Sequence, residues 1–221
     1  MRWIIGLLII SLLIVSGCNV ETTESSECDS LEESSIKDDC YLNEKKCSKI
    51  ENSLVRDTCI VELAKDAQDL KVCKLIKDDM INAHCQEEIA VINNNQELCK
   101  DIEDTYWKDN CNYNLAINND KEVYCSLVNN NEQKGECFKK IALKTNNYLL
   151  CEFLDTINME KCKLTIAKET KDIKICDELS SPINKDSCRK KIAELSDNKE
   201  YCELVTFKQI KQDCLDKFKE N

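Results

Sequence analysis

Glycine, proline and histidine are scarce in this chain of 221 residues, which contains three glycines, one proline and one histidine. Gly6 and Gly17 lie within the first 17 residues, which leaves Gly135 and Pro182 to interrupt the rest of the chain. Sheet proteins usually need Gly, Asn-Gly or Pro at each hairpin turn, whereas helices do not. The shortage therefore predicts an all-α protein.

Sequence patterns of catalytic and metal sites are also missing. There is no C-x-x-C pair, and the single histidine, His84, directly precedes Cys85, which belongs to a repeated set that we expect to be oxidised. Acidic pairs such as Asp78-Asp79 match no calcium loop, and no G-x-S-x-G, P-loop or dinucleotide fingerprint occurs. We therefore expect no metal, no cofactor and no enzymatic activity.

Positive charge is in deficit. The chain has 42 acidic and 31 basic residues, and its formal net charge is −11. A surface of this sign repels nucleic acid and anionic lipid headgroups, so neither is expected as a partner. The charge is otherwise that of a solvated helical surface.

The longest apolar run, from Trp3 to Val15, follows Met1-Arg2 and precedes small residues. A membrane-spanning helix needs about 20 apolar residues, and this run is shorter. A basic start, a short apolar stretch and small residues before a cleavage point are typical of a secretory signal. The pattern predicts a signal peptide over residues 1–17.

The sequence Val15-Ser16-Gly17-Cys18 resembles the lipobox of prokaryotic lipoproteins. The resemblance implies that Cys18 is acylated with diacylglycerol and becomes the mature N-terminus. Residues 18–27, rich in Glu, Ser and Thr, would then be a flexible tether. We expect an exported protein anchored to the outer face of the cytoplasmic membrane or to the cell envelope. An ordinary cleaved signal or an uncleaved anchor are the alternatives.

Cysteine, in contrast, is abundant, with 17 copies. Apart from Cys18, the cysteines form consecutive pairs, and the separation within a pair is nearly constant at about 12 residues. The gap between successive pairs is short once, after Cys40, and then constant, so that from Cys47 onward the pattern recurs about every 26 residues as an internal repeat. Lipidation of Cys18 would account for the odd total.

The near-constant separation within a pair indicates which cysteines are bridged. Pairing across the gaps would leave Cys28 and Cys214 without partners at opposite ends of the array. Metal ligation and reduced thiols are the alternatives. We expect eight disulfides: Cys28–Cys40, Cys47–Cys59, Cys73–Cys85, Cys99–Cys111, Cys125–Cys137, Cys151–Cys162, Cys176–Cys188 and Cys202–Cys214.

Helix-capping residues recur at two positions of the repeat, because Asn, Asp and Ser side chains accept hydrogen bonds from the first turn of a helix. Five of the six residues that stand four positions before the first cysteine are of this type, with Lys121 as the exception: Asp69, Asn95, Asn147, Asp172 and Asn198. The set seven residues before the second cysteine is Asn52, Asp78, Asp104, Asn130, Asp155 and Ser181. Each repeat is therefore predicted to contain a short helix and a longer second helix of about 14 residues.

Apolar residues mark the buried faces of both helices. Three residues after the first cysteine stand Leu31, Ile50, Ile76, Ile102, Val128, Leu154, Leu179 and Val205. Five residues after the second cysteine stand Ala64, Ala90, Ala116, Ala142, Ala167 and Ala193. Small residues there allow a neighbouring helix to approach closely. Residues 28–221 are thus predicted to be an all-α, solenoid-like array of eight disulfide-bridged αα-hairpins of about 26 residues each.

Such stapled hairpins resemble, in architecture, the Sel1-like cysteine-rich secreted proteins. The Sel1-like repeat is longer, its bridged cysteines are closer together, and its Gly/Ala signature is missing here, so no functional residue is transferred from it.

One aromatic pair stands out, Tyr106-Trp107 on the second helix of the fourth repeat. Tyr and Trp are frequent in interface hot spots, so these two are the candidate partner-binding residues, with core filling as the alternative. We expect a non-catalytic protein-interaction or structural scaffold tethered in the envelope, whose partner is an envelope or extracellular protein. The second possibility is an extracytoplasmic enzyme or small-ligand-binding protein of the Sel1-like kind.

Overall fold

The computed structural model describes residues 26–219, and all regular elements in this range are helices. They form eight hairpins, here called units 1 to 8, each a short helix followed by a longer one. Units 1 to 4 consist of η1 (Glu27–Ser30) and α1 (Ser34–Asn43), η2 (Cys47–Lys49) and α2 (Ser53–Ala67), α3 (Leu70–Cys73) and α4 (Asp79–Ile92), and α5 (Gln96–Lys100) and α6 (Thr105–Asn119). Units 5 to 8 consist of α7 (Glu122–Cys125) and α8 (Asn131–Thr145), η3 (Tyr148–Phe153) and α9 (Thr156–Thr170), α10 (Lys174–Asp177) and α11 (Pro182–Ser196), and η4 (Lys199–Leu204) and α12 (Lys208–Lys217).

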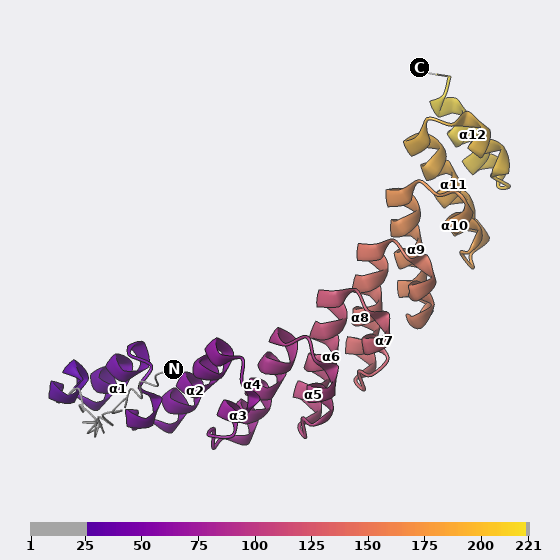
Figure 1. Ribbon diagram of the computed structural model, residues 1–221. Coiled ribbons are helices and arrows are strands. Elements are labelled where there is room, and N and C mark those ends of the chain that lie inside the picture. The colour runs from indigo at the N-terminus through magenta and orange to yellow at the C-terminus, as the bar shows by residue number, and fades with distance from the viewer. Residues whose placement is uncertain (1–25, 220–221) are drawn as a thin grey trace, which may run out of the picture.

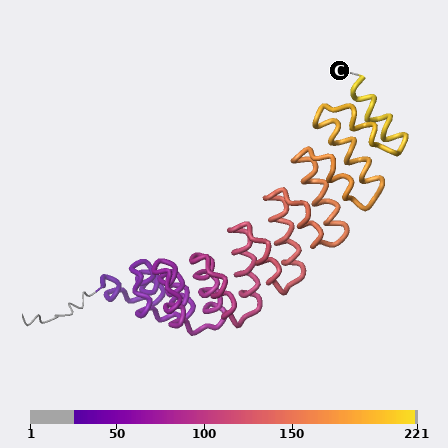
Figure 2. The backbone as a smooth tube through the Cα atoms, turned by 45° about the vertical axis from the view of Figure 1, so that its right-hand side comes forward, coloured from indigo at the N-terminus to yellow at the C-terminus, as the bar shows by residue number. Residues whose placement is uncertain are grey.

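The units stack side by side in one curved row, with unit 1 and unit 8 at opposite ends (Figure 1). The same extended arc is visible after a 45° turn (Figure 2). Each hairpin alone is too small to bury a core, so neighbouring units share one. The predicted repeat array is confirmed, and it extends along an arc rather than folding back on itself.

All eight predicted disulfides are confirmed. Each bridge joins the short helix to the long helix of one unit, with Cα–Cα distances between 5.5 and 5.8 Å. This lies inside the range of about 4.4–6.8 Å in which a disulfide forms without moving the backbone. Most of the bridged cysteines are fully buried, so the bridges are part of the core.

The predicted caps of the long helices are confirmed as well. In units 2 to 7 the capping side chain accepts a hydrogen bond from a backbone N–H of the first turn, and these residues are Asn52, Asp78, Asp104, Asn130, Asp155 and Ser181. Pro182 follows Ser181 at the first helical position, where a missing N–H costs nothing. Local sequence therefore defines where the long helices of units 2 to 7 begin, whereas α1 and α12 begin without a side-chain cap.

The ends of the long helices depend less on residue type. A left-handed residue closes the unit at seven equivalent turns: Lys45, Gln68, Asn94, Asp120, Asn146, Lys171 and Asp197. Asn is tolerant of this conformation, but Gln and Lys cost about 1 kcal/mol or more there. Since Gln68 and Lys171 adopt it too, the tight connection to the next unit determines the conformation.

The aliphatic and alanine positions form the core as expected, with two exceptions among the aliphatic residues. The six alanines are fully buried, as are Ile102 and Val128. Leu31 and Leu154 are only partly buried. Leu31 lies in the first unit, which has no preceding neighbour among the described residues, and Leu154 lies in a turn that is one residue shorter than its equivalents.

A buried carboxylate ties most neighbouring units together. It stands two residues before the second cysteine and accepts hydrogen bonds from two consecutive backbone N–H groups at the start of the next unit's long helix. The residues are Asp38, Asp57, Asp109, Glu160 and Asp186. All five are buried, with at most 8% of their surface exposed. Sequence inspection missed them because isolated acids are normally surface residues, although their recurrence beside the second cysteine was visible.

Candidate functional site

The two candidate binding residues occupy different environments on α6. Tyr106 is 64% exposed, whereas Trp107 is partly buried and packs against the cluster that contains Ala83, Ala90 and Leu115. Their rings meet edge to face with centroids 5.1 Å apart. Neighbouring residues on a helix point about 100° apart, so the two side chains have different surroundings. Tyr106 is the member of the pair that a partner can reach.

Trp107 fills a gap in the carboxylate pattern. Unit 3 has Ala83 at the position that a buried acid occupies in units 1, 2, 4, 6 and 7. The Trp107 indole packs against this cluster, and its ring lies 4.4 Å from the His84 ring, centroid to centroid. An aromatic contact therefore stands where the carboxylate link is missing. The indole thus packs on the preceding unit.

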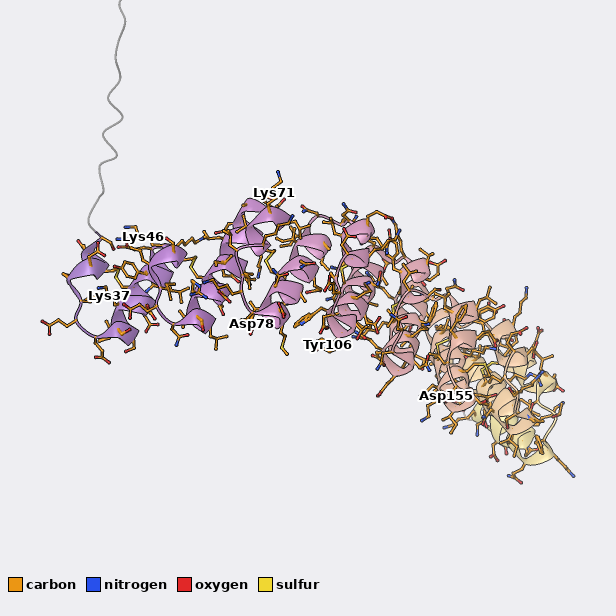
Figure 3. All side chains as sticks on the ribbon, turned by 90° about the horizontal axis from the view of Figure 1, so that it is seen from below. Lys37, Lys46, Lys71, Asp78, Tyr106 and Asp155 are labelled. Carbon is orange, nitrogen blue, oxygen red and sulfur yellow. A yellow bond between two sulfur atoms is a disulfide. The ribbon has the colours of Figure 1, made fainter. Side chains whose placement is uncertain are left out.

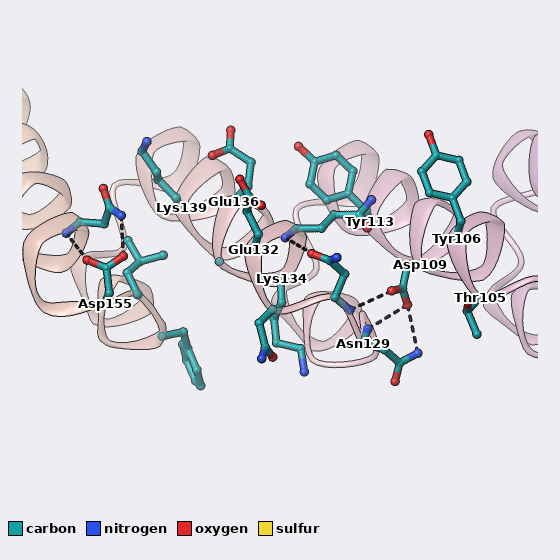
Figure 4. Close-up of a pocket in the computed structure, with 17 residues that line it drawn as sticks. Thr105, Tyr106, Asp109, Tyr113, Asn129, Glu132, Lys134, Glu136, Lys139 and Asp155 are labelled. Carbon is teal, nitrogen blue, oxygen red and sulfur yellow. Dashed lines mark hydrogen bonds between the residues drawn. The ribbon is translucent and has the colours of Figure 1, made fainter.

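A groove of about 1520 Å³ lies beside Tyr106 on units 4 to 6. Figure 4 shows Tyr106 at one end of it and Asp155 at the other, with Asp109 hydrogen-bonded to Asn129 between them. Amide and carboxylate side chains dominate its wall, together with Tyr113 and Phe153. Such a surface offers aromatic faces for packing and many hydrogen-bonding groups.

The groove owes part of its shape to Gly135, the only glycine among the described residues. Gly135 occupies the carboxylate position of unit 5, and the facing turn of unit 6 is the one that lacks a residue. A Cβ atom on Gly135 would lie 3.7 Å from Cδ2 of Leu154, an ordinary contact. Neither a side-chain link nor a full-length turn fills the space at this boundary, so the surface is hollowed there.

A second cluster surrounds His84 on α4. His84, Glu87 and Glu88 offer one nitrogen and two carboxylates within 4.8 Å of one another. The neighbouring Glu87 carboxylate raises the pKa of His84 above its ordinary value and outweighs burial, which lowers it. Glu87 also accepts a 2.7 Å hydrogen bond from Asn114, and the Lys65 ammonium lies 3.4 Å from Glu88.

These contacts indicate a structural role for the His84 cluster. Lys65 comes from unit 2 and Asn114 from unit 4, so the carboxylates of unit 3 connect three consecutive units. The adjacent Cys85 is held in a disulfide and offers no thiolate. A second set of close ligand atoms, at Cys28, Cys40 and Glu44, contains two sulfurs that are bonded to each other.

Residues 1–17 and Cys18 lie outside the described residues, as do most of the tether at 18–27. No helix within residues 26–219 is long and apolar enough to cross a membrane. The many disulfides point to an oxidising, extracytoplasmic environment.

Comparison with protein families, with curated proteins and with solved structures found no match for this chain. The fold and its bridges nevertheless define a class, an all-helical cysteine-rich repeat protein. Kinship with lipoproteins or with Sel1-like proteins stays a prediction from the sequence.

Proposed function

We propose that this protein is a non-catalytic interaction scaffold, tethered at its N-terminus to the outer face of the cytoplasmic membrane or to the cell envelope. The observation that carries the proposal is the architecture. Eight stapled hairpins in a single row present a long surface instead of an enclosed cavity, and repeat arrays of this shape commonly bind polypeptides along an edge or a face. Short covalent bridges inside every unit suit a protein that keeps this surface outside the cytoplasm.

The tether follows from the sequence Val15-Ser16-Gly17-Cys18. A lipid anchor there would place the array a short chain length from the membrane, with its N-terminal unit nearest. The experiment is mass spectrometry of the mature protein, in which an acylated N-terminal Cys18 is expected. In a Cys18→Ala variant the protein should be released or accumulate as precursor. A variant that stays membrane-bound at mature size would instead indicate an uncleaved anchor.

Tyr106 marks the partner-facing surface in this proposal. Its ring is exposed at one end of the groove and packs edge to face against Trp107, so it offers a large aromatic contact area. The neighbouring amides Asn129 and Asn130 supply hydrogen-bonding groups. Aromatic and amide groups together are suited to a protein segment rather than to a lipid surface.

The experiment is photo-crosslinking in the native envelope with a reactive amino acid at position 106. The matched control carries the same group at Val123, which is similarly exposed, at 59%, on the opposite edge of the array. Crosslinks to a protein are expected from position 106 only. Tyr106→Ala should leave the melting temperature unchanged and weaken recovery of that protein. Equal crosslinking from both positions, or none from 106, would refute the assignment of this face.

A further inference from the structure

Exposed apolar side chains are concentrated on one edge of the array. The hairpin-turn edge is defined here as the residues between the first cysteine of each unit and the first turn of its long helix. Figure 3 shows Asp78, Tyr106 and Asp155 along this edge and Lys46 and Lys71 on the other side. Eleven of the fifteen exposed large hydrophobic residues lie on it: Ile36, Leu54, Leu75, Met80, Tyr106, Leu127, Phe153, Ile157, Ile183, Leu204 and Phe207.

Most of these residues occupy two equivalent positions of the repeat. One row stands two residues after the first cysteine: Leu75, Leu127, Phe153 and Leu204. The other stands two residues after the cap of the long helix: Leu54, Met80, Tyr106, Ile157 and Ile183. Because equivalent positions line up in a stacked array, the two sets form apolar rows along the edge. Asp101 and Glu178 interrupt the first row, and Glu132 interrupts the second. Isolated exposed hydrophobics are common, but contiguous ones mark interaction surfaces.

The same edge is also the acidic side of the molecule. In units 3 to 8 this edge contains eleven acidic and four basic residues, counted over residues 74–81, 100–107, 126–133, 152–158, 177–184 and 203–210. The opposite edge is formed by the stretches that precede the first cysteines. It contains ten acidic and eight basic residues, counted over residues 65–72, 91–98, 117–124, 143–150, 168–175 and 194–201. Some of the acids are neutralised, since Arg189 pairs with Asp177 and Lys211 with Glu203. Asp101, Glu103 and Glu132 are exposed on this edge.

From this combination we propose that the hairpin-turn edge binds an extended, basic segment of a partner protein that carries an apolar side chain at about every third residue. Neighbouring packed helices lie about 8–10 Å apart, so side chains at equivalent positions of neighbouring units are separated by roughly that distance. A segment in the polyproline-II conformation covers about 9 Å in three residues, and because this helix has three residues per turn, every third side chain faces the same side. Lysine or arginine between the apolar side chains would meet the acidic groups of the edge.

Charge decides between this occupant and its competitors. A second copy of the array would bring one acidic edge against another, and a membrane rich in anionic lipid would be repelled as well. A basic segment is attracted along the whole edge. The inference rests on the proposed scaffold function and adds to it the chemistry of the partner.

The direct test measures binding of a fluorescent peptide of six Lys-Leu-Ser triplets to the disulfide-intact array by anisotropy. Two control peptides separate the contributions, one with Glu in place of Lys and one of the same composition with the leucines placed together. Only the basic peptide with period three is expected to bind tightly, and about tenfold more weakly at high salt. Equal binding of the acidic peptide or of the clustered one would overturn the proposal.

Paired variants of the array locate the site. A triple variant, Met80→Ser, Tyr106→Ser and Ile157→Ser, should weaken peptide binding at least about tenfold, because these three members of the second row are 64–68% exposed. The matched control combines Val123→Ser and Leu149→Ser, both 59% exposed on the opposite edge, and should bind normally. Likewise Asp101→Lys, Glu103→Lys and Glu132→Lys together should abolish the salt dependence, whereas Glu122→Lys, Glu169→Lys and Glu200→Lys should retain it.

Two further measurements identify other occupants. Sedimentation of the array alone would reveal self-association, and flotation with neutral phosphatidylcholine vesicles would reveal lipid binding. The proposal is wrong if the peptide fails to bind the unmodified array and the array instead self-associates or binds vesicles in a way that the Met80/Tyr106/Ile157 serine variant loses. The edge would then serve a second copy or a lipid surface. Protein crosslinks at position 106 without peptide binding would leave the scaffold function standing and reject the basic segment. Peptide binding without any envelope crosslink would show that the edge can bind a basic segment and would reject the proposed scaffold function in the envelope.

Discussion

Removing the buried carboxylate of Asp186 should uncouple the last unit from the rest of the array. One oxygen of this fully buried carboxyl accepts hydrogen bonds from the backbone N–H groups of Thr206 and Phe207, at 2.8 and 2.7 Å, and from the Thr206 hydroxyl. The other oxygen accepts a 3.0 Å hydrogen bond from Arg189. Asp186 thereby connects unit 7 to the start of α12 in unit 8.

The magnitude follows from what Asp186→Ala leaves behind. Two backbone N–H groups lose their acceptor and a guanidinium loses its buried partner, and breaking a buried pair on one side costs about 3–5 kcal/mol. Asp186→Asn keeps one acceptor oxygen and should cost about 1–2 kcal/mol. The control is Asp177→Ala, which removes an exposed carboxylate from the same Arg189 and should cost less than about 1 kcal/mol.

Hydrogen exchange measures where this free energy acts. In a repeat array, stability is approximately a sum of unit and nearest-neighbour contributions, so the loss should stay local. Amide exchange in unit 8 should accelerate on the order of a hundredfold in Asp186→Ala, which corresponds to about 3 kcal/mol, while units 1 to 5 are unaffected. Uniform acceleration in all units, or none in unit 8, would refute the idea that the carboxylate is a local link between units.

The remaining predictions concern acid, cysteine and two positions of the array. Burial raises the pKa values of Asp57, Glu160 and Asp186, but the hydrogen bonds they accept outweigh burial and hold these pKa values below their ordinary range. Carboxyls of this kind stabilise the fold above the unfolded-state pKa of about 4 and lose that contribution as pH falls. The free energy of unfolding, measured by denaturant titration, should therefore decrease below about pH 4. Non-reducing peptide mapping should recover the eight bridges within units, and mainly cross-gap bridges would contradict the hairpins. Gly135→Ala should raise the free energy of unfolding by about 0.5–1 kcal/mol, because alanine favours the helix and its Cβ would meet only Leu154, at an ordinary contact distance. A lower free energy of unfolding would show that the space beside Gly135 is needed for packing. Trp107→Ala should cost about 2 kcal/mol, less than for a fully buried Trp, and an unchanged melting temperature would show that its packing is incidental.

Sequence reasoning reached far in this protein because the repeat displays the same local signals many times. Capping side chains such as Asn52 and Asp155 were identifiable by their fixed distance from a cysteine. Pairing was identifiable because the separation within a pair stays nearly constant while the gap between pairs varies. The aromatic pair on α6 was recognised as unusual, and its two members proved to have different surroundings. Its role in binding stays a prediction.

Other features depended on contacts between units, which a single repeat does not reveal. An acid such as Asp186 looks like a surface residue until the backbone N–H groups of Thr206 and Phe207 are placed against it. Likewise, an apolar residue such as Ile157 looks like a candidate for the core until stacking shows that its position faces solvent. The burial of Asp186 and the exposure of Ile157 both depend on neighbours in adjacent units, which lie far away along the chain. Local periodicity of the sequence does not report contacts at that separation.

The sequence by itself determined the helical class, the repeat length, the helix starts and the disulfide pairing, because each follows from interactions within one hairpin. Only the tertiary structure decided how the hairpins stack into an arc, which acids are buried between them and where the apolar rows lie. The physical reason is that stacking depends on packing and hydrogen bonds between units, and these are satisfied only when all neighbours are in place.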